Sequence, residues 1–206
     1  MSGVFVTFEG GDGSGKTTQI QLLKKWLEDH GHTVVVTREP GGTDLGNELR
    51  EIILHRKGFI APRAEALLYA ADRAHHIHTL VKPALERGEV VVQDRYLDSS
   101  LAYQGAGRVL DPHEVREVSL WATENLMPVL TVLLDVPADV AKKRQNALER
   151  AYDRLEAEAE DFHQRVRTSY QALADAEPER FLVIDGTLAI EAIHDQIIQK
   201  VSHLLS

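Results

Sequence analysis

The sequence predicts a three-layer α/β/α fold, in which helices cover both faces of a five-stranded parallel sheet and a short helical lid lies beside it. Two observations lead to this fold class. Short runs of Val, Ile, Leu and Phe alternate with segments whose apolar residues repeat at helical spacing. The runs are nearly continuous in apolar residues, which is typical of parallel strands buried on both faces. A length of 206 residues suits one such domain, and we expect residues 1–206 to form it.

The strands are predicted from the apolar runs. These runs are residues 4–8, 33–37, 90–93, 129–136 and 181–185. Because helical patterns separate them, right-handed crossovers are expected to join them into one parallel sheet.

The helices are predicted from apolar stripes. The stripes are Ile20, Leu23 and Leu27, ending near His30-Gly31; Leu45, Leu49, Ile52 and Ile53; residues 111–127; and Ile190, Ile193, Ile197, Val201 and Leu204. Residues 142–161 differ, because they are highly charged and contain few large apolar side chains. On their charge alone, they are either a solvated helix face or a mobile lid.

Composition and charge exclude several classes of protein. Lys and Arg number 23 against 32 Asp and Glu, a net charge of -9, which argues against a broad nucleic-acid surface but not against a small phosphate ligand. The chain has no cysteine, so disulfides, thiol nucleophiles and thiolate metal sites are excluded. No apolar run approaches the ~18 residues of a membrane span, and no signal peptide precedes Glu9. We therefore expect a cytoplasmic protein that binds neither nucleic acid nor membranes.

The strongest functional signal is the segment Gly10-Gly11-Asp12-Gly13-Ser14-Gly15-Lys16-Thr17, which matches G-x-x-x-x-G-K-[ST] at every fixed position. It follows a predicted strand and opens a predicted helix. Backbone N–H groups of such a loop converge on phosphate oxygens, and the helix N-terminus adds partial positive charge. We expect Lys16 to reach the β- and γ-phosphates, Thr17 to ligate Mg²⁺, and Thr18 to lie in the same nucleotide site.

This segment predicts a fold of the P-loop NTPase type. GTPases read their base with an N-K-x-D segment, which the chain lacks. The phosphate donor is therefore expected to be ATP.

Two further motifs stand at the predicted carboxyl ends of strands, where ligands of open α/β sheets bind. In Asp94-Arg95-Tyr96, Asp94 is expected near Mg²⁺, directly or through water, and Arg95 offers a planar fork for a phosphate. Residues 37–43 contain Pro-Gly-Gly, a turn that a ligand can approach closely. Taken alone, the first motif also fits a surface ion pair, and the second also fits a plain connecting loop. Beside a P-loop, we interpret them as parts of one site.

Together with Phe8-Glu9-Gly10 and Ala102-Tyr103-Gln104-Gly105, these motifs resemble those of the bacterial thymidylate kinases. Those enzymes transfer the γ-phosphate of ATP to dTMP, giving dTDP and ADP. The motifs occur in the family's order and spacing along essentially the whole chain. The resemblance implies ATP and Mg²⁺ as cofactors, dTMP as the acceptor and a symmetric homodimer.

The resemblance also implies roles for individual residues. Asp12 would lie near the acceptor's sugar hydroxyl or phosphate. Tyr69 would stack on the base, and Arg73, on the same helix face, would hydrogen-bond the base carbonyl edge. Tyr103 would crowd the sugar 2′ position and disfavour ribonucleotides. The other residues implied in the acceptor site are Glu39, Pro40, Arg50, Ser99, Ser100 and Gln104.

The lid, residues 142–156, is expected to supply a catalytic arginine. Some family members carry this arginine in the P-loop, at the position that is Gly13 here. We favour Arg150 for this role, with Arg144 second and as part of the ATP site. The other lid candidates are Lys143 and Arg154.

Phosphoryl transfer is expected to depend on positioning and charge stabilisation, because a phosphate oxygen is already an adequate nucleophile. Lys16, Arg95, Mg²⁺ and the lid arginine would neutralise the transferred group, and lid closure would exclude water. Another nucleoside monophosphate kinase, a deoxynucleoside kinase and a nucleotide-dependent switch remain as alternatives. We interpret His75-His76-Ile77-His78 as an exposed or pocket-flanking helix face rather than a metal site.

Overall fold

The computed structural model describes residues 3–146 and 153–205, and within them five strands form one parallel sheet. The strands are β1 (Val4–Glu9), β2 (Val34–Arg38), β3 (Val90–Asp94), β4 (Leu130–Asp135) and β5 (Phe181–Asp185), in the order β2-β3-β1-β4-β5. In the central pairings, Val6 lies opposite Val92 of β3 and Leu130 of β4. The predicted sheet is confirmed, and each strand lies within about one residue of its predicted run.

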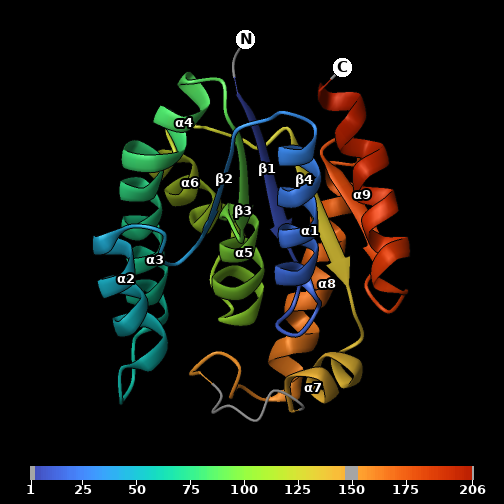
Figure 1. The fold of residues 1–206 in the computed structure, drawn as a ribbon. Helices are drawn as coiled ribbons and strands as arrows, with labels where there is room; N and C mark the ends of the chain where they lie inside the picture. The colour runs from blue at the N-terminus through green and yellow to red at the C-terminus, as the bar shows by residue number, and fades with distance from the viewer. Residues whose placement is uncertain (1–2, 147–152, 206) are drawn as a thin grey trace.

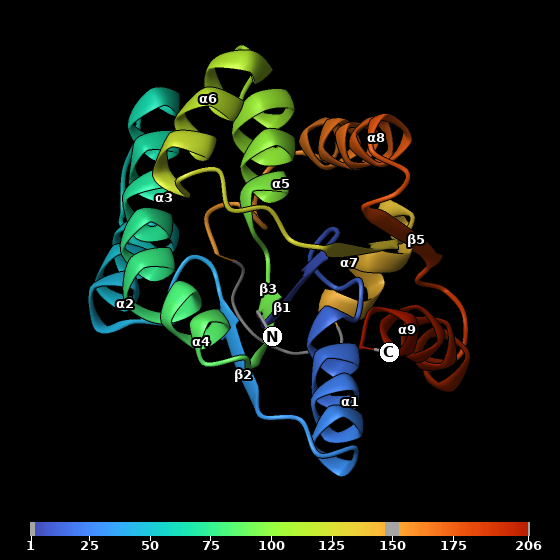
Figure 2. The same cartoon turned by 90° about the horizontal axis from the view of Figure 1, so that it is seen from above.

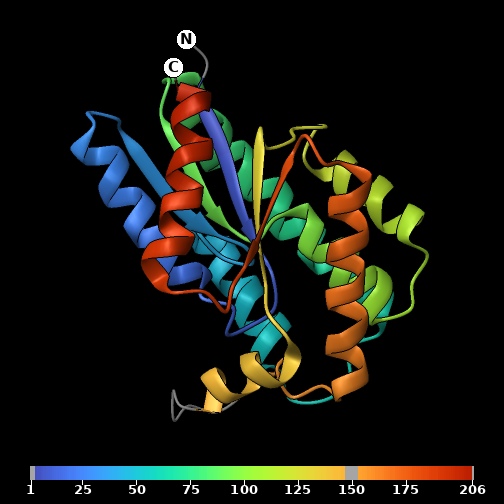
Figure 3. The same ribbon diagram turned by 90° about the vertical axis from the view of Figure 1, so that its right-hand side faces the viewer.

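Helices cover both faces of this sheet, as the two rotated views show (Figures 2 and 3). Helices α1 (Lys16–Asp29) and α9 (Ile190–Leu205) lie side by side on one face. The helices of the other face are α3 (Pro62–His76), α5 (Leu97–Ser100), α6 (Pro112–Ala122) and α8 (Glu160–Ala176). The remaining α-helices are α2 (Asp44–Arg50), α4 (Lys82–Glu86) and α7 (Ala138–Asn146). Segments of π-helix continue α2, α3 and α5 as Glu51–His55, Ile77–Val81 and Leu101–Gly107.

The apolar stripes explain most of this packing. Leu23 and Leu27 of α1 are fully buried with Ile197 and Val201 of α9, in one core against the sheet. The stripe of residues 45–53 is only partly buried, because Leu45 and Ile52 are 43% and 41% exposed. No helix of the described ranges is long and apolar enough to cross a membrane.

The predicted helix over residues 111–127 is too long. Helix α6 ends at Ala122, because Glu124 and Asn125 adopt positive φ angles of 51° and 59° and turn the chain. This left-handed turn carries no glycine; the stop signals that the sequence offers there are Asn125, which tolerates a positive φ, and Pro128.

The carboxyl ends of the strands position the site. Every strand ends in a charged residue, and all five residues lie at one edge of the sheet: Glu9, Arg38, Asp94, Asp135 and Asp185. At this edge lie the loop between β1 and α1 and, beyond it, helix α7 (Figure 1). Ligands of open parallel sheets bind at this edge.

Candidate functional site

The glycine-rich loop joins β1 to the N-terminus of α1. The Lys16 ammonium folds back over the loop and donates to the carbonyls of Gly10 and Gly11 at 3.1 and 3.0 Å. Burial, and then the nearby Arg95 charge, lower the pKa of Lys16. Thr17 and Thr18 are exposed in the first turn of α1. The loop thus leads into a helix N-terminus, where phosphates bind, and the Lys16 ammonium lies over the same loop.

Asp12, Arg95 and Tyr103 form a tight cluster beside this loop. Arg95 Nη2 donates to Asp12 Oδ1 at 2.6 Å, and the Tyr103 hydroxyl donates to Asp12 Oδ2 at 3.2 Å. Burial alone would raise the pKa of Asp12, but the charges of Arg95 and Lys16 lower it to about 2. Asp12 is therefore ionised and holds the guanidinium of Arg95 in a fixed orientation.

Glu9, which we did not predict as a site residue, holds the neighbouring turn in place. Its carboxylate accepts from the Tyr96 backbone N–H at 2.7 Å and from the hydroxyls of Ser99 and Tyr170 at 2.6 and 2.8 Å. Burial, and then the charge of Asp98, raise its pKa to about 7. A carboxylate at the end of a buried apolar strand was the signal for this role, since burying a charge is costly without partners.

A pocket opens on the other side of the Asp12–Arg95 pair. The residues lining it are Asp12, Glu39, Pro40, Arg50, Leu54, Tyr69, Arg73, Arg95, Tyr96, Ser99, Tyr103, Gln104, Asp153 and Leu155. All the predicted acceptor residues are among them except Ser100, whose hydroxyl accepts from Arg73 at 3.1 Å. Sequence reasoning missed Leu54, Asp153 and Leu155, which reach the pocket only through tertiary packing, and Tyr96, which stood in a recognised motif but was given no role.

Arg73 is held rigidly at the wall of this pocket. It is 1% exposed, and its Nε donates to Glu39 at 2.7 Å. Its Nη2 donates to the Tyr96 carbonyl and Ser100, and its Nη1 donates to Ser119 at 3.3 Å. A guanidinium has five N–H donors, so one hydrogen on Nη1 is left for a ligand.

His76 agrees with the pocket-flanking alternative of the prediction for the histidine cluster, not with the exposed one. It is fully buried behind the pocket residue Glu39, and its ring nitrogens lie 3.0 Å from Glu39 Oε1 and 2.7 Å from Thr37 Oγ1. Glu39 is thus held by both Arg73 and His76, and it acts on the pocket by orienting Arg73. Over the described ranges, no group of three potential metal-ligating His, Cys, Asp or Glu side chains occurs.

The lid candidates lie in different places. Arg144 of α7 donates to the Gly186 carbonyl at 3.0 Å and to the Ser14 carbonyl at 3.5 Å, so it spans the P-loop and the turn after β5. Arg154 pairs with Glu65, and the exposed Lys143 lies 3.5 Å from Asp139. Arg150, our preferred catalytic arginine, lies outside the described residues.

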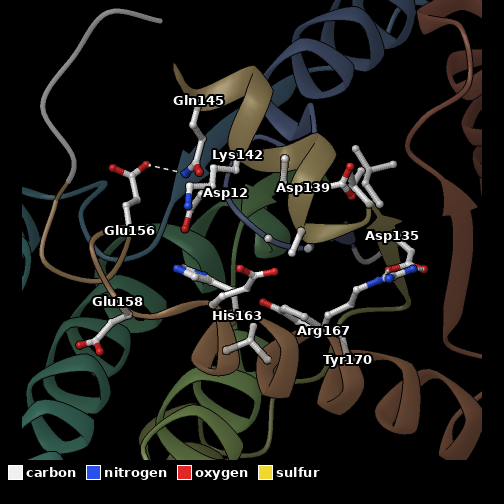
Figure 4. Close-up of a pocket in the computed structure, with 18 of the residues that line it drawn as sticks. Asp12, Asp135, Asp139, Lys142, Gln145, Glu156, Glu158, His163, Arg167 and Tyr170 are labelled. Carbon is white, nitrogen blue, oxygen red and sulfur yellow. Dashed lines mark hydrogen bonds and ion pairs between the residues drawn. The ribbon is translucent and has the colours of Figure 1, made fainter. Parts of the chain in front are cut away.

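A larger cavity of about 280 Å³ lies between α7 and α8. Figure 4 shows Gln145 of α7 joined to Glu156 by a hydrogen bond of 3.3 Å, with Arg167 of α8 directed at Asp135. This cavity lies beside the P-loop and shares the side chains of Asp12 and Tyr103 with the pocket around Arg73, so the two cavities adjoin there.

Comparison with known proteins identifies the family. The model of the thymidylate kinase family matches residues 8–197. The chain belongs to the thymidylate kinase family. It is 66% identical to the thymidylate kinase of Clavibacter sepedonicus over 197 residues, covering 96% of this chain and 93% of that one. It is 47% identical to that of Thermomicrobium roseum over 201 residues, covering 98% and 95%.

A solved structure agrees with this result. The crystal structure of thymidylate kinase from Ehrlichia chaffeensis matches with a TM-score of 0.80 and 30% identity, covering 98% of this chain and 99% of that one. The predicted fold class and the resemblance to thymidylate kinases are confirmed.

The residues predicted to hold Mg²⁺ fit that ion. Asp94, at the end of β3, has a buried Oδ1 with no hydrogen-bond partner in the described part of the chain. Carboxylate and hydroxyl oxygens are the ligands that Mg²⁺ prefers. In a thymidylate kinase, Asp94 and the exposed Thr17 are thus suitable ligands beside the P-loop.

Proposed function

We propose that this chain transfers the γ-phosphate of ATP to dTMP, giving dTDP and ADP, in the synthesis of dTTP. The observation that carries this function is the position of the Asp12–Arg95 pair, which lines the Arg73 pocket and adjoins the P-loop. The two nucleotides would thus meet on either side of one ion pair. Since their phosphates meet at Arg95, in-line transfer is expected.

The held side chains suit the acceptor. Arg73 presents a fixed donor to a base carbonyl, and Tyr69 offers a ring for stacking, worth about 1–3 kcal/mol for one base. Tyr103 is 4% exposed and bonded to Asp12 and Arg95, so it limits the space at the sugar. These contacts support a deoxynucleotide acceptor.

The donor side depends on the loop. Lys16 exchanges its two carbonyl partners for phosphate oxygens, and Arg95 stabilises the charge on the transferred group. Mg²⁺, when held by Thr17 and Asp94, supplies Lewis-acid stabilisation of that charge. Arg144 reaches the turn after β5 and contributes to the ATP site, and Arg150 remains our proposal for the catalytic lid arginine.

One experiment separates this function from its alternatives. ADP release is measured with ATP, Mg²⁺ and each of dTMP, dUMP, UMP, CMP, AMP and thymidine. We expect the highest kcat/KM with dTMP. A maximum with thymidine would indicate a nucleoside kinase, and no ADP with any acceptor would indicate a nucleotide switch.

We also propose a homodimer in the cytoplasm. Leu67 of α3 and Trp121 of α6 are 59% and 81% exposed, and these two helices pack against each other. Exposed apolar side chains on adjoining helices support a subunit contact there. Light scattering of the wild type and of Trp121→Glu tests it, with a monomeric wild type contradicting the proposal.

A further inference from the structure

Glu65 is a buried carboxylate outside the acceptor pocket that bonds to one of the residues lining it. It precedes Tyr69 by one turn of α3 and is fully buried. Its Oε1 accepts from Gln104 Nε2 at 2.9 Å and from Arg108 Nε at 3.2 Å. Its Oε2 accepts from Arg108 Nη2 and pairs with Arg154. Although burial raises the pKa of Glu65, Gln104 and Arg108 lower it overall, so the group is ionised.

The charge of Glu65 fixes which way the Gln104 amide points. An ionised carboxylate only accepts hydrogen bonds, so Gln104 must turn its NH₂ group toward Glu65. Gln104 lines the acceptor pocket, whereas Glu65 is not among the described residues that line it. The carbonyl oxygen of Gln104 is consequently turned away from Glu65 and is the acceptor that this amide offers to a ligand.

This orientation selects one pattern of hydrogen-bond donors and acceptors on the edge of a pyrimidine base. Gln104 offers an acceptor and Arg73 offers its remaining Nη1 hydrogen as a donor. A 4-oxo pyrimidine presents an N3–H donor beside a carbonyl acceptor, which complements both groups. A 4-amino pyrimidine presents an N3 acceptor beside an amino donor, so both contacts would oppose it.

We propose that Glu65 is a positioning residue that sets acceptor specificity, by holding the Gln104 carbonyl toward the N3–H of a 4-oxo pyrimidine nucleotide. The inference rests on the proposed function. A flipped Gln104 would direct its NH₂ group into the pocket and would favour a 4-amino base. The two arginines that bond to Glu65 keep it ionised and in place.

The test compares dUMP with dCMP, because these acceptors differ only at the edge in question. In Glu65→Gln, residue 65 can both donate and accept, so Gln104 is free to flip. We expect the ratio of kcat/KM for dUMP over dCMP to fall about tenfold or more, with an unchanged KM for ATP. Glu114→Gln is the matched control, since it makes the same change of charge in an exposed ion pair with Arg63 and lies outside the acceptor pocket. It is expected to leave the ratio unchanged.

A double-mutant cycle shows whether Glu65 acts through Gln104. In a Gln104→Ala background, Glu65→Gln should no longer change the ratio. Glu65→Asp serves as a second variant if Glu65→Gln does not fold. It keeps the negative charge, but its shorter side chain withdraws that charge from Gln104, so it should also lower the ratio of kcat/KM for dUMP over dCMP. A folded variant with the wild-type ratio, or an equal change in both backgrounds, overturns the inference. If the wild type phosphorylates neither dTMP nor dUMP, the proposed function itself fails.

Discussion

Gly13 marks the point at which helix α7 packs on the P-loop, and Gly13→Ala tests this contact. A Cβ at Gly13 would lie 2.6 Å from the Ala141 carbonyl oxygen and 3.1 Å from Gln145 Cγ, both on α7. To reach ordinary contact, the carbonyl would have to move by about 0.8 Å, because close-packed atoms tolerate little overlap. The φ angle of +80° adds a cost of about 1–2 kcal/mol for any L side chain.

Such a shift would move Arg144 away from the Ser14 and Gly186 carbonyls. A misplacement of about 1 Å in a catalytic assembly reduces turnover by up to about 100-fold. We therefore expect kcat/KM for ATP to fall between about 10- and 100-fold, and amide hydrogen exchange in α7 to become faster.

Gly31→Ala is the matched control for Gly13→Ala. Gly31 has a φ angle of +84°, but a Cβ there meets no heavy atom within 4 Å. This variant should lose about 1 kcal/mol of unfolding free energy, measured in urea, and keep wild-type kinetics. If Gly13→Ala had the kinetics and the α7 exchange rates of Gly31→Ala, the packing argument would be refuted.

Three other predictions concern charge in and around the site. Lys16→Ala and Arg95→Ala should each lower kcat by at least about 100-fold in the ADP-release assay while circular dichroism shows a retained fold, and near wild-type turnover would contradict the assignment. Removal of Mg²⁺ with EDTA should abolish ADP release, and added Mg²⁺ should restore it; persistent turnover would exclude the Thr17–Asp94 site. Burial, and then the charge of Glu39, raise the pKa of Asp72 to about 7. Between about pH 4 and 7 the folded state therefore retains a proton that the unfolded state has lost, so the contribution of Asp72 to the free energy of unfolding falls as the pH rises. Asp72→Asn should remove that part of the pH dependence, which is at most about 4 kcal/mol, when the free energy of unfolding is measured in urea at pH 5 and 7.5. An unchanged difference between the two pH values would contradict this prediction.

The sequence was informative wherever the physical cause is local. Strands buried on both faces must be apolar along their length, so the runs located all five strands. The P-loop was recognisable because its glycines and Lys16 act within one turn of chain. The family resemblance then brought distant residues, such as Tyr69 and Gln104, to the same pocket.

The buried polar contacts around the site could not be predicted, because their partners lie far apart in the sequence. Nothing near His76 indicates that Glu39 and Thr37 will surround it, since they lie 37 and 39 residues away. Glu65 resembles any acidic residue in the first turn of a helix until Arg108 and Arg154 fold against it. Buried polar clusters of this kind follow from the fold and cannot be derived from spacing alone.

Arg50 is the pocket cation best placed to bind the acceptor phosphate. Arg95 is paired with Asp12 and Arg73 with Glu39, so each of these guanidinium groups already has a carboxylate partner without substrate. Arg50 donates to the Pro40 carbonyl at 2.9 Å but has no ion-pair partner in the described part of the chain. Burial, and then repulsion from Arg38, lower its pKa, and both effects make a bound anion favourable.

Arg50→Ala should therefore weaken the binding of dTMP more than it slows phosphoryl transfer. We expect KM for dTMP to rise about tenfold with a smaller change in kcat, because a charge-assisted hydrogen bond contributes about 1.5–3 kcal/mol. Thymidine, which has no phosphate, is the matched ligand, and its inhibition constant should stay at the wild-type value. If the binding of thymidine weakened as much as that of dTMP, Arg50 would be supporting the pocket wall instead of binding the phosphate. The paired Arg95 would then have to bind the acceptor phosphate by giving up its contact with Asp12.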